Sequence, residues 1–448
     1  MTRAPHRARS ADLYAVLAAA LLVLLAVLVG RHLQDAYRVL FVHWPPLFAD
    51  WDPHVGPGTP AAVLVAAAVV AYGPNLAERL PWRGLLAAAF GACLAWTWSL
   101  ALVDGWRRGV AGRLTSPNEY LTVIGRFHDI PATLRDFTHH IVSGTPAPWP
   151  AHIAGHPPAA TLTFVLLDRV GLSGGGWAGA WCITVGSSAC VAVLVAVRAL
   201  AAERLARRAA PFLVMAPAAV WVGASADGYF AAVAAWAVAL LALAVTGRSM
   251  TGWAAGAGLL YGLTCYLSYG LTLFALIGAA VLVLGRRRVR ARPVVLVPLV
   301  AGAAVVPVVF TLAGFDWSEG YRLLVTRYYQ GVGGTRPYGY WVWANLACTV
   351  VVIGPAAVAG LRRAGAALLR RRTTDSAPVR LAFLVAVALV ALLVADVSGM
   401  SKAETERIWL PFAMWLLPAA AFLPRPRVWL AAQALLALLV NHLLFTGW

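Results

Sequence analysis

Long apolar segments separated by short polar stretches recur from one end of the chain to the other. Most have about 17 to 25 residues, enough for an α-helix to cross the ~30 Å hydrocarbon core of a bilayer. A backbone inside lipid must satisfy its own hydrogen bonds, so a helix is the expected conformation. The pattern predicts an all-α, polytopic membrane protein with about thirteen spans. The predicted spans cover residues 12–30, 61–76, 83–103, 177–201, 209–224, 228–246, 250–266, 269–285, 294–314, 341–361, 379–397, 409–423 and 428–446.

The composition agrees with this class. Of 448 residues, 61% are hydrophobic and only 12% are charged, and the mean hydropathy of +0.75 is above that of soluble globular chains. The net charge is +18, but the basic residues stand at the ends of apolar segments rather than on one face of a soluble domain. That distribution is typical of the positive-inside rule. It favours the lipid bilayer, and not nucleic acid, as the partner of this chain.

The arginines also predict the topology. One stretch, Pro157–Leu172, is apolar enough to be either a short span or a helix on the surface. If it does not cross, every basic group falls on the side of the N-terminus, which is then cytoplasmic. We therefore expect a surface helix there and a large extracytoplasmic loop at 104–176. The basic groups are Arg3, Arg7 and Arg9, Arg79 and Arg83, Arg204, Arg207 and Arg208, Arg248, residues 286–292, residues 362–372, and Arg425 and Arg427.

The first apolar segment, 12–30, resembles a signal sequence because it follows a basic N-terminus. It is long, lacks a small-residue cleavage site and is followed by further spans, so we expect a retained anchor. The carboxylates gather in the predicted external loops, whereas the predicted cytoplasmic loops are short and hold mostly arginine. No G-x-x-x-x-G-K-[ST] loop is present in the sequence, which disfavours an ATP-driven pump.

The external loop 104–176 concentrates acids, histidines and aromatic residues. It contains Asn118-Glu119-Tyr120 near its start and His156-Pro157-Pro158 near its end. This order resembles the GT-C superfamily of membrane glycosyltransferases, in particular the branch of protein O-mannosyltransferases and lipid A aminoarabinose transferases. Those enzymes carry an Asp-Glu pair soon after a span, then surface helices, then a Lys-Pro-Pro or similar element. Here Asn118 stands in place of the Asp, and His156 in place of the Lys.

Three later positions follow the same family order. Asp227 lies about a hundred residues after Glu119 at an external span junction, a Gly-Leu-rich hairpin follows at 261–270, and Glu406-Arg407 precedes a Leu-Pro pair. The resemblance covers about residues 83–446. It leaves 1–82 as an N-terminal addition of two spans in front of a GT-C-like catalytic module.

The resemblance implies transfer of a sugar from a polyprenyl-phosphate donor to an envelope glycan, lipid or protein acceptor, with inversion of the anomeric configuration. A base must take the acceptor proton. Glu119 is the candidate, either because Asn118 replaces the Asp of the family's first pair or because Glu119 is itself the equivalent of that Asp. Fixed cations must stabilise the leaving phosphate, a task that suits the planar fork of arginine. The implied catalytic residues are Glu119, Asn118 and Asp227, and the implied donor-phosphate or substrate-binding residues are Arg407, His156, Arg327, Tyr120 and Glu406.

Simpler interpretations of these residues stay open. Glu119 could be an ordinary loop acid, Asp227 could cap a helix, and Arg407 could anchor the chain to lipid headgroups. Asp50 and Asp52 compete as catalytic acids. Histidines and acids of the loop could bind a divalent metal, so a metal is possible although no cofactor is required. The candidate metal-binding histidines are His139, His140, His152 and His156.

The alternative function is a polytopic transporter or lipid flippase, with a non-catalytic scaffold as a third hypothesis. No inverted repeat is evident, and ionisable residues are sparse in mid-span, which both disfavour a carrier. Heavy use of Ala, Val, Arg and Gly indicates a bacterium with a GC-rich genome. We therefore expect a bacterial plasma membrane and an extracytoplasmic active site, while the sugar and the acceptor stay open.

Overall fold

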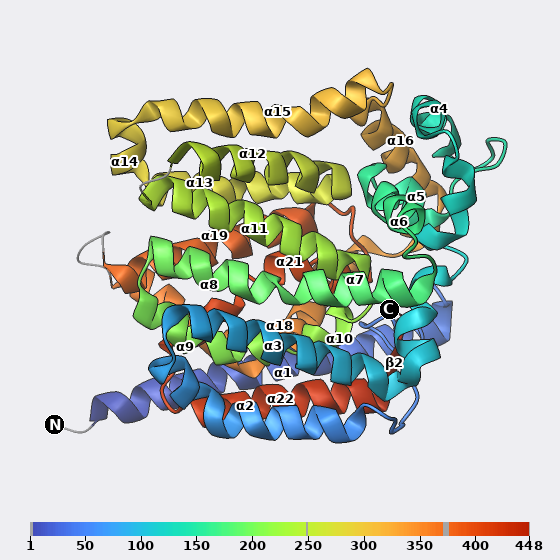
Figure 1. Cartoon of the computed structure of the whole chain (residues 1–448). Helices are drawn as coiled ribbons and strands as arrows, with labels where there is room; N and C mark the ends of the chain where they lie inside the picture. Colours follow the sequence, from blue (N-terminus) through green and yellow to red (C-terminus); the bar gives the residue numbers. More distant parts are fainter. Residues whose placement is uncertain (1–2, 248–249, 371–375, 448) are drawn as a thin grey trace.

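The computed structural model describes residues 3–247, 250–370 and 376–447, and these are almost entirely helical. The long helices run side by side along one direction of the molecule (Figure 1). The α-helices are α1 (Arg3–Tyr37), α2 (Thr59–Arg79), α3 (Trp82–Ala101), α4 (Ile130–Asp136), α5 (Ala151–Gly155), α6 (Ala159–Arg169), α7 (Gly175–Ser187), α8 (Ala189–Leu200), α9 (Glu203–Val214), α10 (Ala219–Val222), α11 (Ala226–Thr246), α12 (Met250–Leu267), α13 (Phe274–Leu284), α14 (Arg286–Ala291), α15 (Leu296–Leu312), α16 (Trp317–Gln330), α17 (Val332–Thr335), α18 (Tyr338–Leu369), α19 (Ala377–Val397), α20 (Thr405–Ile408), α21 (Leu410–Ala413) and α22 (Pro426–Leu443).

Short 3₁₀ and π segments and one strand pair complete the described fold. The strands β1 (Ala49–Trp51) and β2 (Leu444–Thr446) pair antiparallel and so join the loop after α1 to the end of α22. The short helical segments are η1 (Leu102–Asp104), the π-helical η2 (Arg107–Ala111), η3 (Arg113–Thr115), η4 (Tyr120–Phe127), η5 (Phe137–His140), η6 (Tyr269–Leu273), η7 (Pro293–Val295) and η8 (Leu417–Phe422).

Eight helical stretches among the described residues are long and apolar enough to cross a membrane, so the all-α polytopic prediction is confirmed. The count of thirteen spans stays a prediction, because the other five apolar segments are shorter, less apolar or interrupted. The eight stretches are Ser10–Tyr37, Thr59–Arg79, Trp82–Asp104, Gly175–Leu200, Ala226–Thr246, Pro293–Leu312, Tyr338–Leu369 and Ala377–Val397.

Two of the remaining segments are broken by proline. The predicted span 209–224 divides at Pro217 into α9 and α10, and the predicted span 409–423 divides into α21 and η8. Proline removes a backbone donor and crowds the preceding turn, so a helix rarely continues through it. Both segments are buried in the bundle, where protein rather than lipid surrounds the irregular backbone.

A further break inside α18 is repaired by a side chain. Gly354 has a φ of 74°, in the left-handed region that favours glycine, and Pro355 follows it. The amide of Gln433 on α22 donates to the carbonyl of Ile353 (3.0 Å) and accepts from the N–H of Ala356 (3.2 Å). The buried Gln433 therefore satisfies backbone groups that the kink takes out of the helical ladder.

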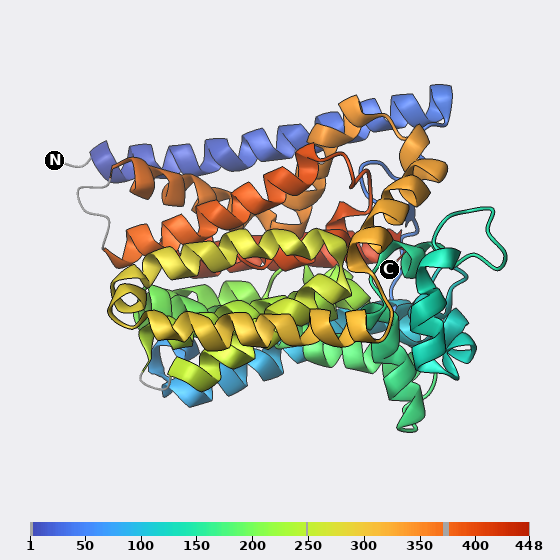
Figure 2. The same ribbon diagram turned by 90° about the horizontal axis from the view of Figure 1, so that it is seen from above.

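The two ends of the bundle differ. The arginine-rich α14 lies at the end where the chain begins, whereas α4, α5, α6 and α16 gather at the opposite end (Figures 1 and 2). The predicted surface helix is α6, whose 11 residues extend about 16 Å, too short to cross a bilayer. The loop 104–176 thus forms a cap at one end, and that cap carries the predicted chemistry.

Helix α11 occupies the centre of the bundle. Of its most apolar window, 83% is buried, compared with 11% for the peripheral α1. The first two helices are nevertheless integrated into the fold, since α1 packs on α18 and α2 packs on α3, α9 and α22. The domain division at residue 82 therefore stays a prediction from sequence.

Candidate functional site

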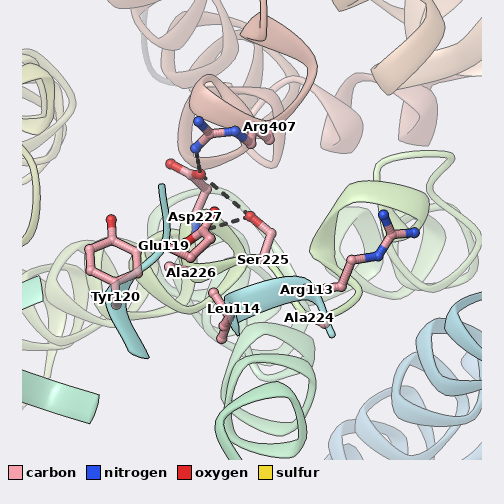
Figure 3. Close-up of a pocket in the computed structure, with 9 residues that line it drawn as sticks. All are labelled: Arg113, Leu114, Glu119, Tyr120, Ala224, Ser225, Ala226, Asp227 and Arg407. Carbon is pink, nitrogen blue, oxygen red and sulfur yellow. Dashed lines mark hydrogen bonds and ion pairs between the residues drawn. The ribbon is translucent and has the colours of Figure 1, made fainter. Parts of the chain in front are cut away.

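Four segments that are distant in sequence meet at the capped end of α11. They are the chain around η3 and η4, helix α5, the start of α11, and the turn that leads into α20. Figure 3 shows the pocket where three of them converge, with Glu119, Asp227 and Arg407 among its lining residues. The structure therefore brings together three of the residues that the sequence singled out, and their roles stay predictions.

The centre of the site is a buried ion pair. Arg407 Nη1 donates to Asp227 Oδ2 at 2.5 Å, and each of the two side chains is 7% exposed or less. Ser225 is the residue that caps α11, because its hydroxyl accepts from the N–H of Asp227. Asp227 thus lies in the first turn, where the positive end of the helix favours a carboxylate. Its side chain is committed to Arg407 rather than to capping.

Glu404 holds the same guanidinium from the other side. Arg407 Nη2 donates to Glu404 Oε2 at 3.0 Å, and Arg336 Nη1 donates to Glu404 Oε1 at 3.4 Å. Ala403 and Glu404 both have a positive φ, which turns the chain sharply before α20. Burial disfavours the charge of Glu404, but the two arginines outweigh it and lower its pKa. Burial likewise opposes the charge of Arg407, yet Asp227 and Glu404 raise its pKa overall.

His152 connects this ion pair to Glu119. Its Nε2 lies 3.0 Å from Arg407 Nη2, and its Nδ1 lies 2.7 Å from Glu119 Oε1. A guanidinium has only donors, so His152 Nε2 must be an acceptor and Nδ1 carries the proton that is donated to Glu119. The contacts thus orient the imidazole, with Nδ1 toward the carboxylate and Nε2 toward the guanidinium.

The second oxygen of Glu119 is buried and unpaired among the described residues. Glu119 is 5% exposed, and its Oε2 has no hydrogen-bond partner within the described parts of the chain. The residue lines a small cavity of about 10 Å³, about the room of one water molecule. Arg113, Tyr120, Ser225, Asp227 and Arg407 share that lining. A carboxylate with one oriented and one unpaired oxygen is suited to accept a proton from a group that enters the cavity.

Tyr120 and His156 form the apolar side of the site. The Tyr120 ring stacks on Phe164 with centroids 5.2 Å apart and meets the edge of His156 at 5.9 Å. His156 Nδ1 donates to the carbonyl of His152 at 2.7 Å. Burial lowers the pKa of His156 to about 4. The imidazole is therefore neutral at physiological pH and supplies no cation to the site.

The other predicted site residues lie outside this cluster. The side chain of Asn118 is exposed, and its carbonyl accepts from the N–H of His152 at 3.2 Å. Glu406 is fully buried and accepts from the N–H of Phe48 at 2.8 Å, so it ties α20 to the first loop. Burial raises the pKa of Glu406 to about 7. Arg327 lies on α16 and makes no side-chain hydrogen bond or ion pair to the cluster among the described residues.

Sequence reasoning assigned no role in this cluster to Glu404 and Arg113, and considered His152 only as a metal ligand. Their only sequence signal is nearness to predicted residues, since Glu404 stands two positions before Glu406 and His152 four before His156.

Within the described residues no group of three or more His, Cys, Asp or Glu side chains is placed to hold a metal ion. The cation that lies among the carboxylates is the guanidinium of Arg407. A divalent metal stays an open prediction.

The fold and the site together define a polytopic helical membrane protein with a buried, charge-paired acidic site at one end of its helix bundle. No protein-family profile matches the sequence, and no curated protein matches it either. Among solved structures, the Archaeoglobus fulgidus oligosaccharyltransferase in complex with Zn and sulfate matches with a TM-score of 0.46 and 15% identity. That match covers 73% of this chain and 48% of the other.

Two further structures of the same archaeal enzyme also match. The form tethered to an acceptor peptide has a TM-score of 0.43 at 12% identity and covers 75% of this chain and 49% of that one. The apo form has a TM-score of 0.44 at 12% identity and covers 77% and 50%. The chain thus spans about half the length of the solved proteins that it matches, and the likeness is distant.

Proposed function

We propose that this protein is a membrane glycosyltransferase that uses a polyprenyl-phosphate sugar, with Glu119 as its base. The observation that carries the proposal is the state of the Glu119 carboxylate. One oxygen is oriented by His152 at 2.7 Å, and the other is buried without a partner among the described residues, in a residue that lines a cavity. An ordinary loop acid would be solvated or fully paired.

The proposed reaction is a single displacement at the anomeric carbon of the donor. The acceptor hydroxyl attacks that carbon, its proton passes to Glu119 Oε2, and the bond from carbon to phosphate oxygen breaks. The electron pair of that bond leaves with the polyprenyl phosphate. Attack opposite the leaving group inverts the anomeric configuration. Proton transfer to a positioned carboxylate contributes typically 10²- to 10⁴-fold to such a rate.

Arg407 has a positioning role in this proposal. Two carboxylates already hold its guanidinium, Asp227 at 2.5 Å and Glu404 at 3.0 Å. Through Nη2 it also fixes the acceptor side of His152, which in turn orients Glu119. Asp227 keeps Arg407 in place. The cations that meet the donor phosphate must therefore come from another part of the site.

The cavity beside Glu119 has room for about one water molecule, so a sugar enters only after this end of the bundle opens. We place the site on the extracytoplasmic side of a bacterial plasma membrane, because the arginine-rich loops then lie inside. Nucleotide sugars are absent there, which is why a lipid-linked donor is proposed. The acceptor would be an envelope glycan, lipid or protein.

The test is a transfer assay with the purified protein in nanodiscs. Radiolabelled polyprenyl-phosphate mannose, glucose and arabinose are offered together with an envelope fraction as the source of acceptor. The Glu119→Gln variant keeps the shape and loses the base, so we expect at least a hundred-fold loss of turnover at unchanged thermal stability. The matched control is Glu319→Gln, the same substitution on α16 at the same end of the bundle.

Equal transfer by wild type and Glu119→Gln would reject the assigned base. If none of the labelled sugars becomes covalently attached, yet proteoliposomes show counterflow of a labelled solute or lipid, the transporter or flippase hypothesis replaces the glycosyltransferase.

A further inference from the structure

A second and larger cavity adjoins the first. It has a volume of about 720 Å³ and lies between the segment after α3 and the C-terminal strand β2. Arg113 lines both cavities, so they are neighbours. In Figure 3 the guanidinium of Arg113 points away from Asp227. The residues that line the larger cavity are Asp104, Gly105, Arg107, Arg108, Gly112, Arg113, Ser116, Phe445 and Gly447.

The lining is cationic. Arg113 donates to Asp104 at 2.9 Å and to the carbonyl of Thr446 at 2.6 Å, and the second oxygen of Asp104 faces His54 at 2.8 Å. Arg108 donates to Asp52 at 2.7 Å. Arg107 is exposed and has no ion pair or side-chain hydrogen bond within the described ranges. Two arginines are therefore matched by carboxylates, and the third leaves an excess positive charge at the cavity.

Two of the guanidinium groups are held in fixed orientations. The guanidinium carbon of Arg108 lies 3.9 Å from the ring centroid of Phe445, and that of Arg113 lies 4.8 Å from the same centroid. Stacking on one aromatic ring restricts both side chains, so little rotamer entropy is left to lose on binding. A planar fork held in this way is suited to the oxygens of a phosphate.

The cavity lies at one end of a candidate membrane span, where lipid headgroups are expected. It follows directly on the candidate span Trp82–Asp104. Trp106, 53% exposed, stacks on Trp98 with ring planes 3° apart, and Trp177, 54% exposed, lies at the start of α7. Exposed tryptophans at the ends of spans mark the level of the headgroups. An anion that sits among these arginines is therefore at the level of lipid phosphate.

We propose that this cavity binds the phosphate group of a polyprenyl-phosphate, with Arg107, Arg108 and Arg113 as its cationic ligands. The inference rests on the proposed function and assigns the donor site that Arg407 leaves unfilled. Because Arg113 belongs to both cavities, a phosphate here lies next to the cavity of Glu119, where the attached sugar would react. As the bond from sugar to phosphate breaks, the phosphate oxygen gains negative charge, which the fixed guanidinium groups stabilise.

The experiment measures binding and not transfer. Quenching of intrinsic tryptophan fluorescence follows the titration of the full-length protein in nanodiscs with polyprenyl monophosphate. Separate arms use inorganic phosphate and inorganic pyrophosphate in solution. The test variant is Arg107→Gln, whose side chain is exposed and unpaired in the described structure, so folding is not affected. The control is Arg322→Gln, an exposed arginine on α16 at the same end of the bundle.

We expect Arg107→Gln to weaken binding of polyprenyl phosphate about ten-fold, the loss of one charge-assisted contact, and Arg322→Gln to leave it unchanged. Equal affinity of wild type and Arg107→Gln would overturn the proposal. So would inorganic phosphate that binds as tightly as the lipid, because the site would then be one for a free anion.

The two proposals fail in different ways. If Arg107→Gln loses binding of the lipid phosphate while wild-type protein transfers no sugar, the phosphate site stands and the glycosyltransferase does not. If Glu119→Gln binds polyprenyl phosphate like wild type but does not transfer, both proposals are supported.

Discussion

Removal of the guanidinium of Arg407 is the perturbation with the clearest expected cost. Arg407→Met keeps the length of the side chain and deletes its charge. Asp227 then loses its ion pair and, among the described residues, keeps the hydroxyl of Ser225, which lies 3.4 Å from Oδ2. Glu404 loses one partner but keeps Arg336 at 3.4 Å. The variant therefore leaves one buried carboxylate, Asp227, without a counter-charge.

The magnitude follows from burial. Asp227 is 4% exposed, and breaking a buried ion pair from one side costs about 3–5 kcal/mol. Asp227→Asn alone should cost less, because Arg407 keeps Glu404 at 3.0 Å. The double variant Asp227→Asn, Arg407→Met removes both charges and should regain much of the loss. We expect the order of stability to be wild type, Asp227→Asn, the double variant, and Arg407→Met as the least stable.

The assay is thermal unfolding in nanodiscs, followed by the fluorescence of the 19 tryptophans. A double-mutant cycle gives the coupling energy between the two positions, which should exceed 1 kcal/mol for a pair in direct contact. If Arg407→Met unfolds at the wild-type temperature, or if the two single losses simply add in the double variant, the assignment of a buried ion pair is refuted.

Three further outcomes follow from other contacts. The pKa of Glu406 is raised to about 7 from an ordinary 4.5, so the folded protein loses stability as pH rises between those values. The free energy of unfolding of Glu406→Gln should therefore exceed that of wild type by about 3 kcal/mol at pH 8 and match it at pH 4.5, measured by unfolding at both pH values. Gln433→Leu should cost about 1–3 kcal/mol in the same assay, because it leaves the backbone of Ile353 and Ala356 unpaired. His156→Gln should leave the pH profile of transfer between pH 6 and 8 unchanged, since burial keeps the pKa of His156 near 4.

The sequence was most informative where an element depends on composition alone. Six of the eight candidate spans were predicted within about three residues at both ends, whereas Ser10–Tyr37 and Tyr338–Leu369 extend well past their predicted ends at 30 and 361. Pro157–Leu172 contains the short α6 instead of a span. The prediction was least informative where tertiary packing replaces a continuous helix. A run of apolar residues such as 409–423 has the same pattern whether it crosses lipid as one helix or packs inside the bundle as α21 and η8.

For the site, the sequence identified Glu119, Asp227 and Arg407, which the structure brings together at one pocket. Periodicity and spacing could not reveal Glu404, because its role depends on a turn of positive φ that aims it at Arg407. The same limit explains why Arg327 was predicted as a site residue: it lies at the correct end of the bundle, on α16, but away from the cluster. Packing decides which of the many arginines contacts an acid, and this contact cannot be predicted from a single sequence.

The distance in sequence between the members of the central ion pair has a consequence for biogenesis. Asp227 and Arg407 are separated by 180 residues, which a ribosome adds in roughly 10 to 40 s. Throughout that interval the nascent chain carries an acidic group in the first turn of its most buried candidate span, without the arginine that pairs with it in the folded protein. Insertion must therefore keep the first turn of α11 in contact with water, or with the insertion machinery, until Arg407, near the end of the 448-residue chain, has been made.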